Sequence, residues 1–133
     1  MRSVIYQSVV LPAPAETLFE MYLDPVAHSA FTSAPVEIGA ETGDSFSAFG
    51  GMLTGAMLRV VSPTLIVQSW RSGKFNEDDA DSTLVLSFKP EGAEGRIDLV
   101  HVDVPEHDFQ GVTEGWETHY WTPWRAYLNT GQA

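Results

Sequence analysis

Histidine and acidic side chains near the end of one predicted strand are the first candidates for chemistry in this chain. His101, Asp103, Glu106 and His107 form the pattern His-x-Asp-x-x-Glu-His, which contains metal-ligating side chains, and residues 101 and 103 are expected on one strand face. The spacing matches neither a helical His-Glu-x-x-His motif nor a two-histidine strand pair. Pro105 also breaks the register before the last two residues. We therefore expect no bound metal.

His101 has two interpretations on its own. An inward-facing histidine is either a core residue, hydrogen-bonded to Tyr120 or to a backbone carbonyl, or a group that orients a polar ligand or acts as a general base. The chain has no Gly-x-Ser-x-Gly, phosphate-binding or dinucleotide-binding motif. The glycines at 50, 51 and 55 indicate a turn followed by close strand packing. No catalytic residue is assigned, and acid–base chemistry through His101 or Glu37 is the enzymatic alternative.

Length and charge narrow the classes of function. The chain of 133 residues is 44% hydrophobic and is expected to form one domain over residues 1–133. It has no cysteine and no run of about 20 apolar residues, so we expect a cytoplasmic protein without a membrane span. The net charge of −11 argues against nucleic-acid and membrane partners.

The aromatic residues gather near the C-terminus and predict a buried helix. Three of the four tryptophans and two of the four tyrosines lie between Gly115 and Leu128. Trp116, Tyr120 and Trp124 fall on one helical stripe, which needs a partner surface. The helix is expected after a connection over residues 105–113, with a bend but no break at Pro123.

The rest of the chain predicts an α+β fold. Two short helices follow the first strand; Pro14 favours the start of the first, and Asp24 is the expected N-cap of the second, over Val26–Phe31. From residue 34 to 104 the hydrophobic period is two, which indicates an antiparallel meander. Pro90–Gly95 is the expected hairpin loop. The expected strands are Val4–Leu11, Pro35–Ile38, Ser45–Phe49, Leu53–Val61, Leu65–Arg71, Thr83–Phe88 and Arg96–Val104.

Several short motifs, taken in order, resemble a known family. The motifs are Asp24-Pro25, Ala30-Phe31-Thr32, Gly43 before Phe46, Gly50-Gly51-x-x-x-Gly55, the run Ile66–Arg71, and Gly115-Trp116-x-x-x-Tyr120-Trp121-x-Pro123. Together they resemble the activator-of-Hsp90-ATPase-homologue (AHSA1-like) branch of the START-like, or SRPBCC, superfamily, from about residue 4 to residue 128.

The resemblance implies a helix-grip fold of the START/Bet v 1-like kind. In it, a curved antiparallel sheet of six to seven strands wraps around a long C-terminal helix, with two short helices after strand 1. Family members commonly enclose an apolar cavity between sheet and helix. Eukaryotic members stimulate the Hsp90 ATPase with the help of a separate N-terminal domain, which is not expected here.

A ligand cavity is the candidate site, and a solid aromatic core is the alternative. The expected lining is Phe31, Phe49, Met57, Trp70, Leu99, His101, Trp116, Tyr120 and Trp124. We expect a small hydrophobic ligand, no cofactor, and a monomer or homodimer, with His101 and Tyr120 holding the polar end of the ligand. Two other functions are the alternatives: an interaction module that binds a chaperone or another protein, and a polyketide-cyclase-like enzyme that uses the cavity.

Overall fold

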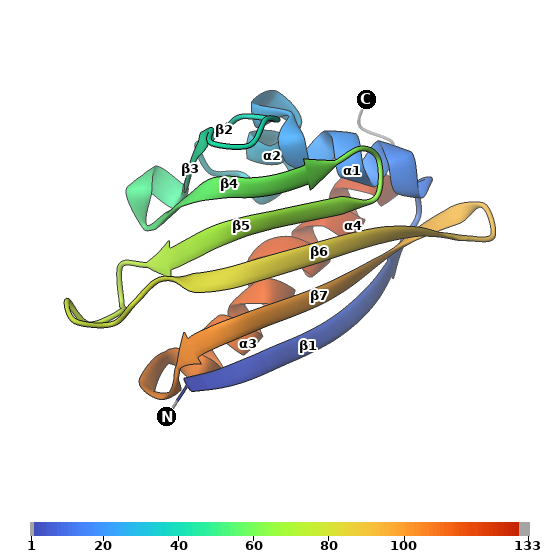
Figure 1. The fold of residues 1–133 in the computed structure, drawn as a ribbon. Coiled ribbons are helices and arrows are strands. Elements are labelled where there is room, and N and C mark those ends of the chain that lie inside the picture. Colours follow the sequence, from blue (N-terminus) through green and yellow to red (C-terminus); the bar gives the residue numbers. More distant parts are fainter. Residues whose placement is uncertain (1, 131–133) are drawn as a thin grey trace.

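A computed structural model describes residues 2–130, apart from the side chain of residue 2. Seven strands and a long C-terminal helix form two layers, with two short helices after the first strand (Figure 1). The strands are β1 Arg2–Leu11, β2 Val36–Ile38, β3 Ser45–Ala48, β4 Leu53–Val61, β5 Leu65–Ser72, β6 Ser82–Glu91 and β7 Glu94–Pro105. The helical segments are α1 Ala15–Leu23, α2 Pro25–Thr32, η1 Phe49–Gly51, η2 Glu106–Asp108, α3 Phe109–Trp116, η3 Glu117–Trp121 and α4 Thr122–Asn129.

The strands form one open antiparallel sheet in the order β1-β7-β6-β5-β4-β3-β2. Burial alternates along β5 and β6, because one face of each strand packs on the helices and the other faces solvent. The long helix crosses the concave face of the sheet, as Figure 1 shows. The α+β helix-grip fold predicted from the sequence is therefore confirmed. No helix of the described residues is long and apolar enough to cross a membrane.

Local sequence signals account for the two short helices. Pro14 precedes α1 as its N-cap residue, with Glu16 in the first turn, where the helix dipole favours a negative charge. The Asp24 carboxylate accepts a hydrogen bond from the backbone N–H of Val26 at 2.9 Å and caps α2. Pro25 takes the first helical position, where its fixed φ suits the helix and its missing N–H costs no hydrogen bond.

The long helix begins earlier than the sequence suggested. The connection expected over residues 105–113 is only the η2 turn, and α3 starts at Phe109. Gly111 and Gly115 make this segment a poor helix by intrinsic propensity, and its packing on the sheet overrides that preference. The hairpin loop is also shorter than predicted, because β6 and β7 continue to Glu91 and Glu94 and leave two residues in the turn.

A π-helical turn, η3, lies between α3 and α4. The backbone N–H of Thr122 donates to the carbonyl of Glu117, five residues earlier. Pro123 follows at once, and the wider turn relieves the crowding between its ring and the carbonyl of His119. The helix therefore continues through the proline, and Tyr120 and Trp121 are both buried.

The gap between sheet and helix is filled at one end only. The short helices α1 and α2 close the end beside α4, where the ring of Phe31 stacks on Trp124 at 4.1 Å between centroids. The other end of the gap is bordered by three segments: the η1 turn, the loop of residues 73–81 and α3. Gly50 and Gly51 of η1 have φ of 67° and 92°, which glycine adopts without strain.

Candidate functional site

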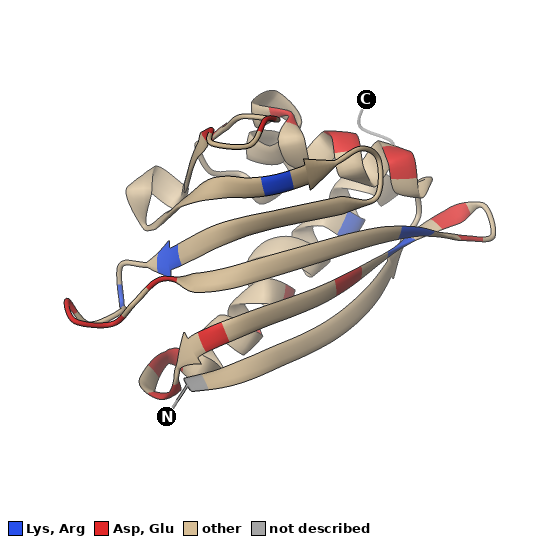
Figure 2. Ribbon diagram, viewed as in Figure 1, with Lys and Arg blue, Asp and Glu red and all other residues tan. Residues whose placement is uncertain are grey.

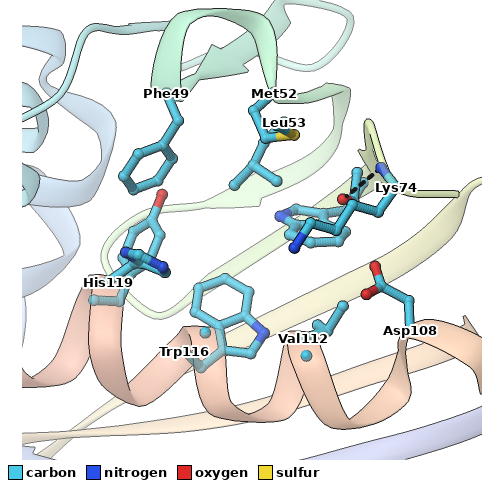
Figure 3. A pocket seen from close by; sticks show the side chains of 13 residues that line it. Phe49, Met52, Leu53, Lys74, Asp108, Val112, Trp116 and His119 are labelled. Atoms are coloured by element: carbon cyan, nitrogen blue, oxygen red, sulfur yellow. Dashed lines mark hydrogen bonds between the residues drawn. The ribbon is translucent and has the colours of Figure 1, made fainter.

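A pocket of about 360 Å³ opens between the start of the long helix and the sheet (Figure 3). This volume lies in the range of small-molecule sites, roughly 300 to 1,000 Å³. The η1 turn and β4 form one side, β5 the floor, and α3 and η3 the other side. Its apolar walls are Phe49, Met52, Leu53, Trp70, Val112 and Trp116.

Four of the nine residues predicted for the cavity line this pocket: Phe49, Trp70, Trp116 and Tyr120. The structure places the other five in the packed core outside the lining: Phe31, Met57, Leu99, His101 and Trp124. Each of the five is at most 2% exposed, so tight packing fills the space around them. The assignment of ligand contacts to these residues remains a prediction.

His101 is held in a closed hydrogen-bond chain behind the pocket floor. The indole N–H of Trp116 donates to Nδ1 of His101 at 3.2 Å, so the ring proton lies on Nε2. Nε2–H donates to Ser82 Oγ at 2.9 Å, and the hydroxyl of Ser82 donates to the carbonyl of Trp70 at 2.6 Å. Burial lowers the pKa of His101 to about 3. Both ring nitrogens are thus occupied, and His101 is a neutral core histidine.

Tyr120 bonds a different histidine from the one expected. Its hydroxyl donates to Nε2 of His28 at 2.8 Å, and Nδ1–H of His28 donates to the carbonyl of Tyr22 at 2.7 Å. Burial lowers the pKa of His28 to about 4, partly offset by the bond to the Tyr22 carbonyl. Burial also raises the pKa of the Tyr120 hydroxyl. Sequence reasoning missed His28, although it lies three residues before Phe31 and so on the same helical face.

Four further polar residues line the pocket, namely Ser72, Lys74, Asp108 and His119, and Figure 3 shows Lys74 and Asp108 at its mouth. All four were missed, because the sequence placed Lys74 in a surface loop and Asp108 in a connection. Once α3 starts at Phe109, the positions 108, 111, 115 and 119 follow one helical face. That spacing is the signal that could have found this side of the pocket.

The loop that carries Lys74 is fixed by Arg71. Its guanidinium donates to the carbonyl of Asn76 at 2.8 Å and to that of Asp79 at 2.7 Å, and it pairs with Asp81 at 3.2 Å. Arg71 therefore ties the acidic loop to the end of β5. Because the loop forms part of the mouth, Arg71 indirectly sets the position of Lys74.

The histidine-rich pattern at the end of β7 does not converge. His101 is buried, whereas Asp103 is exposed, so the expectation that they share a strand face was wrong. A register shift opposite Ser3 and Ile5 and a φ of 63° at Asp103 rotate the strand there. His107 instead bonds Asp79 at 3.0 Å. Among residues 2–130, no group of three or more metal-ligating side chains could hold an ion.

Comparison with known proteins places this arrangement in a family. Residues 12–129 match the family model described as activator of Hsp90 ATPase homolog 1-like protein. The chain belongs to this family. A relative in Schizosaccharomyces pombe, an uncharacterised protein, is 28% identical over 114 residues, which cover 77% of this chain. The matched segment spans only about a third of that relative, 34% of its length.

Solved structures share the family fold along most of the chain. An HSP90 activator from Plasmodium falciparum superposes with a TM-score of 0.82 at 22% identity, covering 97% of this chain and 96% of that one. The Aha1 dimer from Colwellia psychrerythraea superposes with a TM-score of 0.80 at 11% identity, covering 98% of this chain and 99% of that one. CalU16 from Micromonospora echinospora superposes with a TM-score of 0.69 at 24% identity, covering 89% of this chain and 70% of that one. At these identities the likeness is one of fold.

Proposed function

We propose that this domain binds a small amphipathic molecule in the pocket between α3 and the sheet. The pocket itself carries the proposal, because it combines about 360 Å³ of space with walls of large apolar rings. Burying an apolar ligand there would gain about 25 cal/mol per Å² of apolar surface removed from water. The open end of the helix grip, opposite α1 and α2, gives the ligand its route of entry.

Packing around the pocket supports a preformed site. Trp70 and Trp116 lie 6.1 Å apart between ring centroids, and both contact the imidazole of His101, whose hydrogen bonds fix the rings from behind. Phe49 packs against Tyr120 at 6.1 Å and His119 at 5.6 Å on the opposite side. A rigid apolar wall costs little ordering on binding, which favours affinity.

Binding of a neutral apolar fluorophore, N-phenyl-1-naphthylamine, tests the proposal. We expect saturable binding with quenching of tryptophan fluorescence, since Trp70 and Trp116 line the site. Gly115→Leu should abolish binding without unfolding the protein, because a side chain there enters the pocket. Ala126→Leu, at an exposed position of α4, is the matched control and should bind like the wild type. Absence of binding, or binding unchanged in Gly115→Leu, would overturn the proposal.

A protein-partner role is the second proposal, and the family itself favours it. The fold matches nearly the whole of an HSP90 activator structure, and this chain carries a net charge of −11. Acidic residues gather in the loop of residues 73–81 and in η2, as Figure 2 shows. An acidic surface of this kind suits a basic partner surface. Calorimetry against purified Hsp90 should show binding that weakens steeply with salt; no binding at low salt would remove this proposal.

No reaction is proposed for the histidines of the core. A general base needs a free lone pair directed at its substrate. In His101 that lone pair accepts from Trp116, and in His28 it accepts from Tyr120. Both residues therefore serve the architecture of the site.

A further inference from the structure

The side chain of Asp108 lies largely buried at the pocket mouth, with its carboxylate open to the pocket. Asp108 is 8% exposed and lines the pocket, and Figure 3 shows its carboxylate directed into the space beside the helix. Although it stands at the N-cap of α3, its side chain does not cap the helix. Within residues 2–130, no hydrogen bond or ion pair reaches this side chain. Its oxygens are not among the buried polar atoms that lack a partner, so they reach the space of the pocket, where a ligand can supply a hydrogen-bond donor.

The local chain is built to leave this carboxylate free. A Cβ atom at residue 111 would lie 3.0 Å from Oδ1 of Asp108, so the glycine there leaves room for the carboxylate over the first turn. The positive end of the helix dipole favours a negative charge at this position. Asp108 is therefore an acceptor whose oxygens face the space of the pocket.

We propose that the pocket selects molecules that carry a protonated amine, which Asp108 binds at the mouth while the apolar body lies between Trp70 and Trp116. This inference rests on the proposed ligand-binding function and names its ligand class. The aromatic walls favour the same choice, since ring faces attract cations. The net charge of −11 adds a long-range attraction for cations that an anionic ligand would not have.

Lys74 opposes the amine and supplies a second test. It is exposed and lines the mouth, and its ammonium forms no ion pair within the described part of the chain. Its four-carbon stem lets the charge move into solvent when a cation enters. Removing this charge should strengthen the binding of an amine, and would weaken the binding of an anion.

A matched pair of probes separates the amine from the apolar body. We expect 2-naphthylmethylamine to bind at least about tenfold more tightly than 2-naphthylmethanol, measured by calorimetry and tryptophan fluorescence at moderate salt. Asp108→Asn, which keeps the shape of the side chain, should remove this preference. Glu94→Gln, which removes a charge at the exposed end of the β6–β7 hairpin, should keep it. Lys74→Gln should increase it.

Each outcome decides between the inference and the function on which it rests. Equal affinity for the two probes, lost in Gly115→Leu, would overturn the amine preference and leave ligand binding in place. A preference that survives in Asp108→Asn would also overturn the inference. If neither probe binds, both proposals fall. Should Asp108→Asn lose its fold by circular dichroism, Gly111→Ala is the second variant: it crowds the carboxylate and should lower the preference.

Discussion

The indole of Trp116 and the imidazole of His101 meet at 3.2 Å, and this hydrogen bond joins the long helix to β7 directly behind the pocket. Trp116 faces the pocket on its other side, so one side chain belongs both to the core and to the site. The rigidity of the pocket wall therefore depends on a polar chain that runs from Trp116 through His101 to Ser82.

The first prediction concerns the far end of this chain. Ser82→Ala leaves the Nε2–H of His101 without an acceptor and should lower the free energy of unfolding by about 1–3 kcal/mol. Ser87→Ala is the control, because it lies on the half-buried face of the same strand and its side chain makes no hydrogen bond among the described residues. Urea unfolding measures both. Equal stability of the two variants would show that the hydrogen bond between His101 and Ser82 contributes nothing to the free energy of unfolding.

The second prediction is a loss of stability in mild acid. His28 and His101 have pKa values of about 4 and about 3 in the folded protein, below the value of about 6.5 in an unfolded chain. Between these values the unfolded state binds more protons, so stability falls as the pH decreases. From pH 7 to pH 5 each buried histidine should cost roughly 2 kcal/mol.

Urea unfolding at several pH values and imidazole NMR check this pH dependence. The signals of His28 and His101 should remain those of neutral rings at pH 5. Stability that is flat or that rises between pH 7 and pH 5 would contradict the prediction.

The third prediction separates stability from binding at Gly115. A Cβ atom there meets only His119, at 3.7 Å, so Gly115→Ala fits without strain and should stabilise the helix by about 0.5–1 kcal/mol. The same methyl group narrows the pocket and should weaken binding of N-phenyl-1-naphthylamine. Ala126→Gly in α4 should show the reverse change in stability with unchanged binding. A less stable Gly115→Ala would mean that residue 115 has closer neighbours than His119 at 3.7 Å.

The fourth prediction concerns the loop at the pocket mouth. Arg71→Lys keeps the charge but cannot reach two carbonyls at once, so residues 73–81 should lose protection in hydrogen exchange. The global unfolding free energy should change by less than about 1 kcal/mol, since the side chain is partly exposed. Arg59→Lys, at an exposed position of β4, is the control. Unchanged exchange in the loop would show that other contacts hold it.

The sequence predicted the architecture because its signals are local and consistent. Asp24 and Pro25 mark a helix start, alternation marks β5 and β6, and the spacing of Trp116, Tyr120 and Trp124 marks a buried helical face. Each of these features depends on residues within one turn or one strand. The order of elements and the antiparallel sheet followed from them.

The site was harder to predict because one boundary was misplaced. Residues 105–113 are predicted from the sequence to form a connection, so Asp108 is not recognised there as part of a helical face; Gly111 lowers the helix propensity of this segment. The polar partners of His101 and Tyr120 could not be predicted either, since they depend on which distant segments lie side by side in the fold. Ser82 and His28 are 19 and 92 residues away from those partners along the chain.

The widened turn at η3 divides the long helix into two parts with different neighbours. Beyond it, α4 packs its tryptophan against α2 and seals the closed end; before it, α3 offers a row of small residues to the open end. The two parts are joined by the one turn whose hydrogen-bond spacing is already relaxed. Substitutions along α3 can therefore reshape the entrance during evolution while the sealed half of the molecule stays as it is.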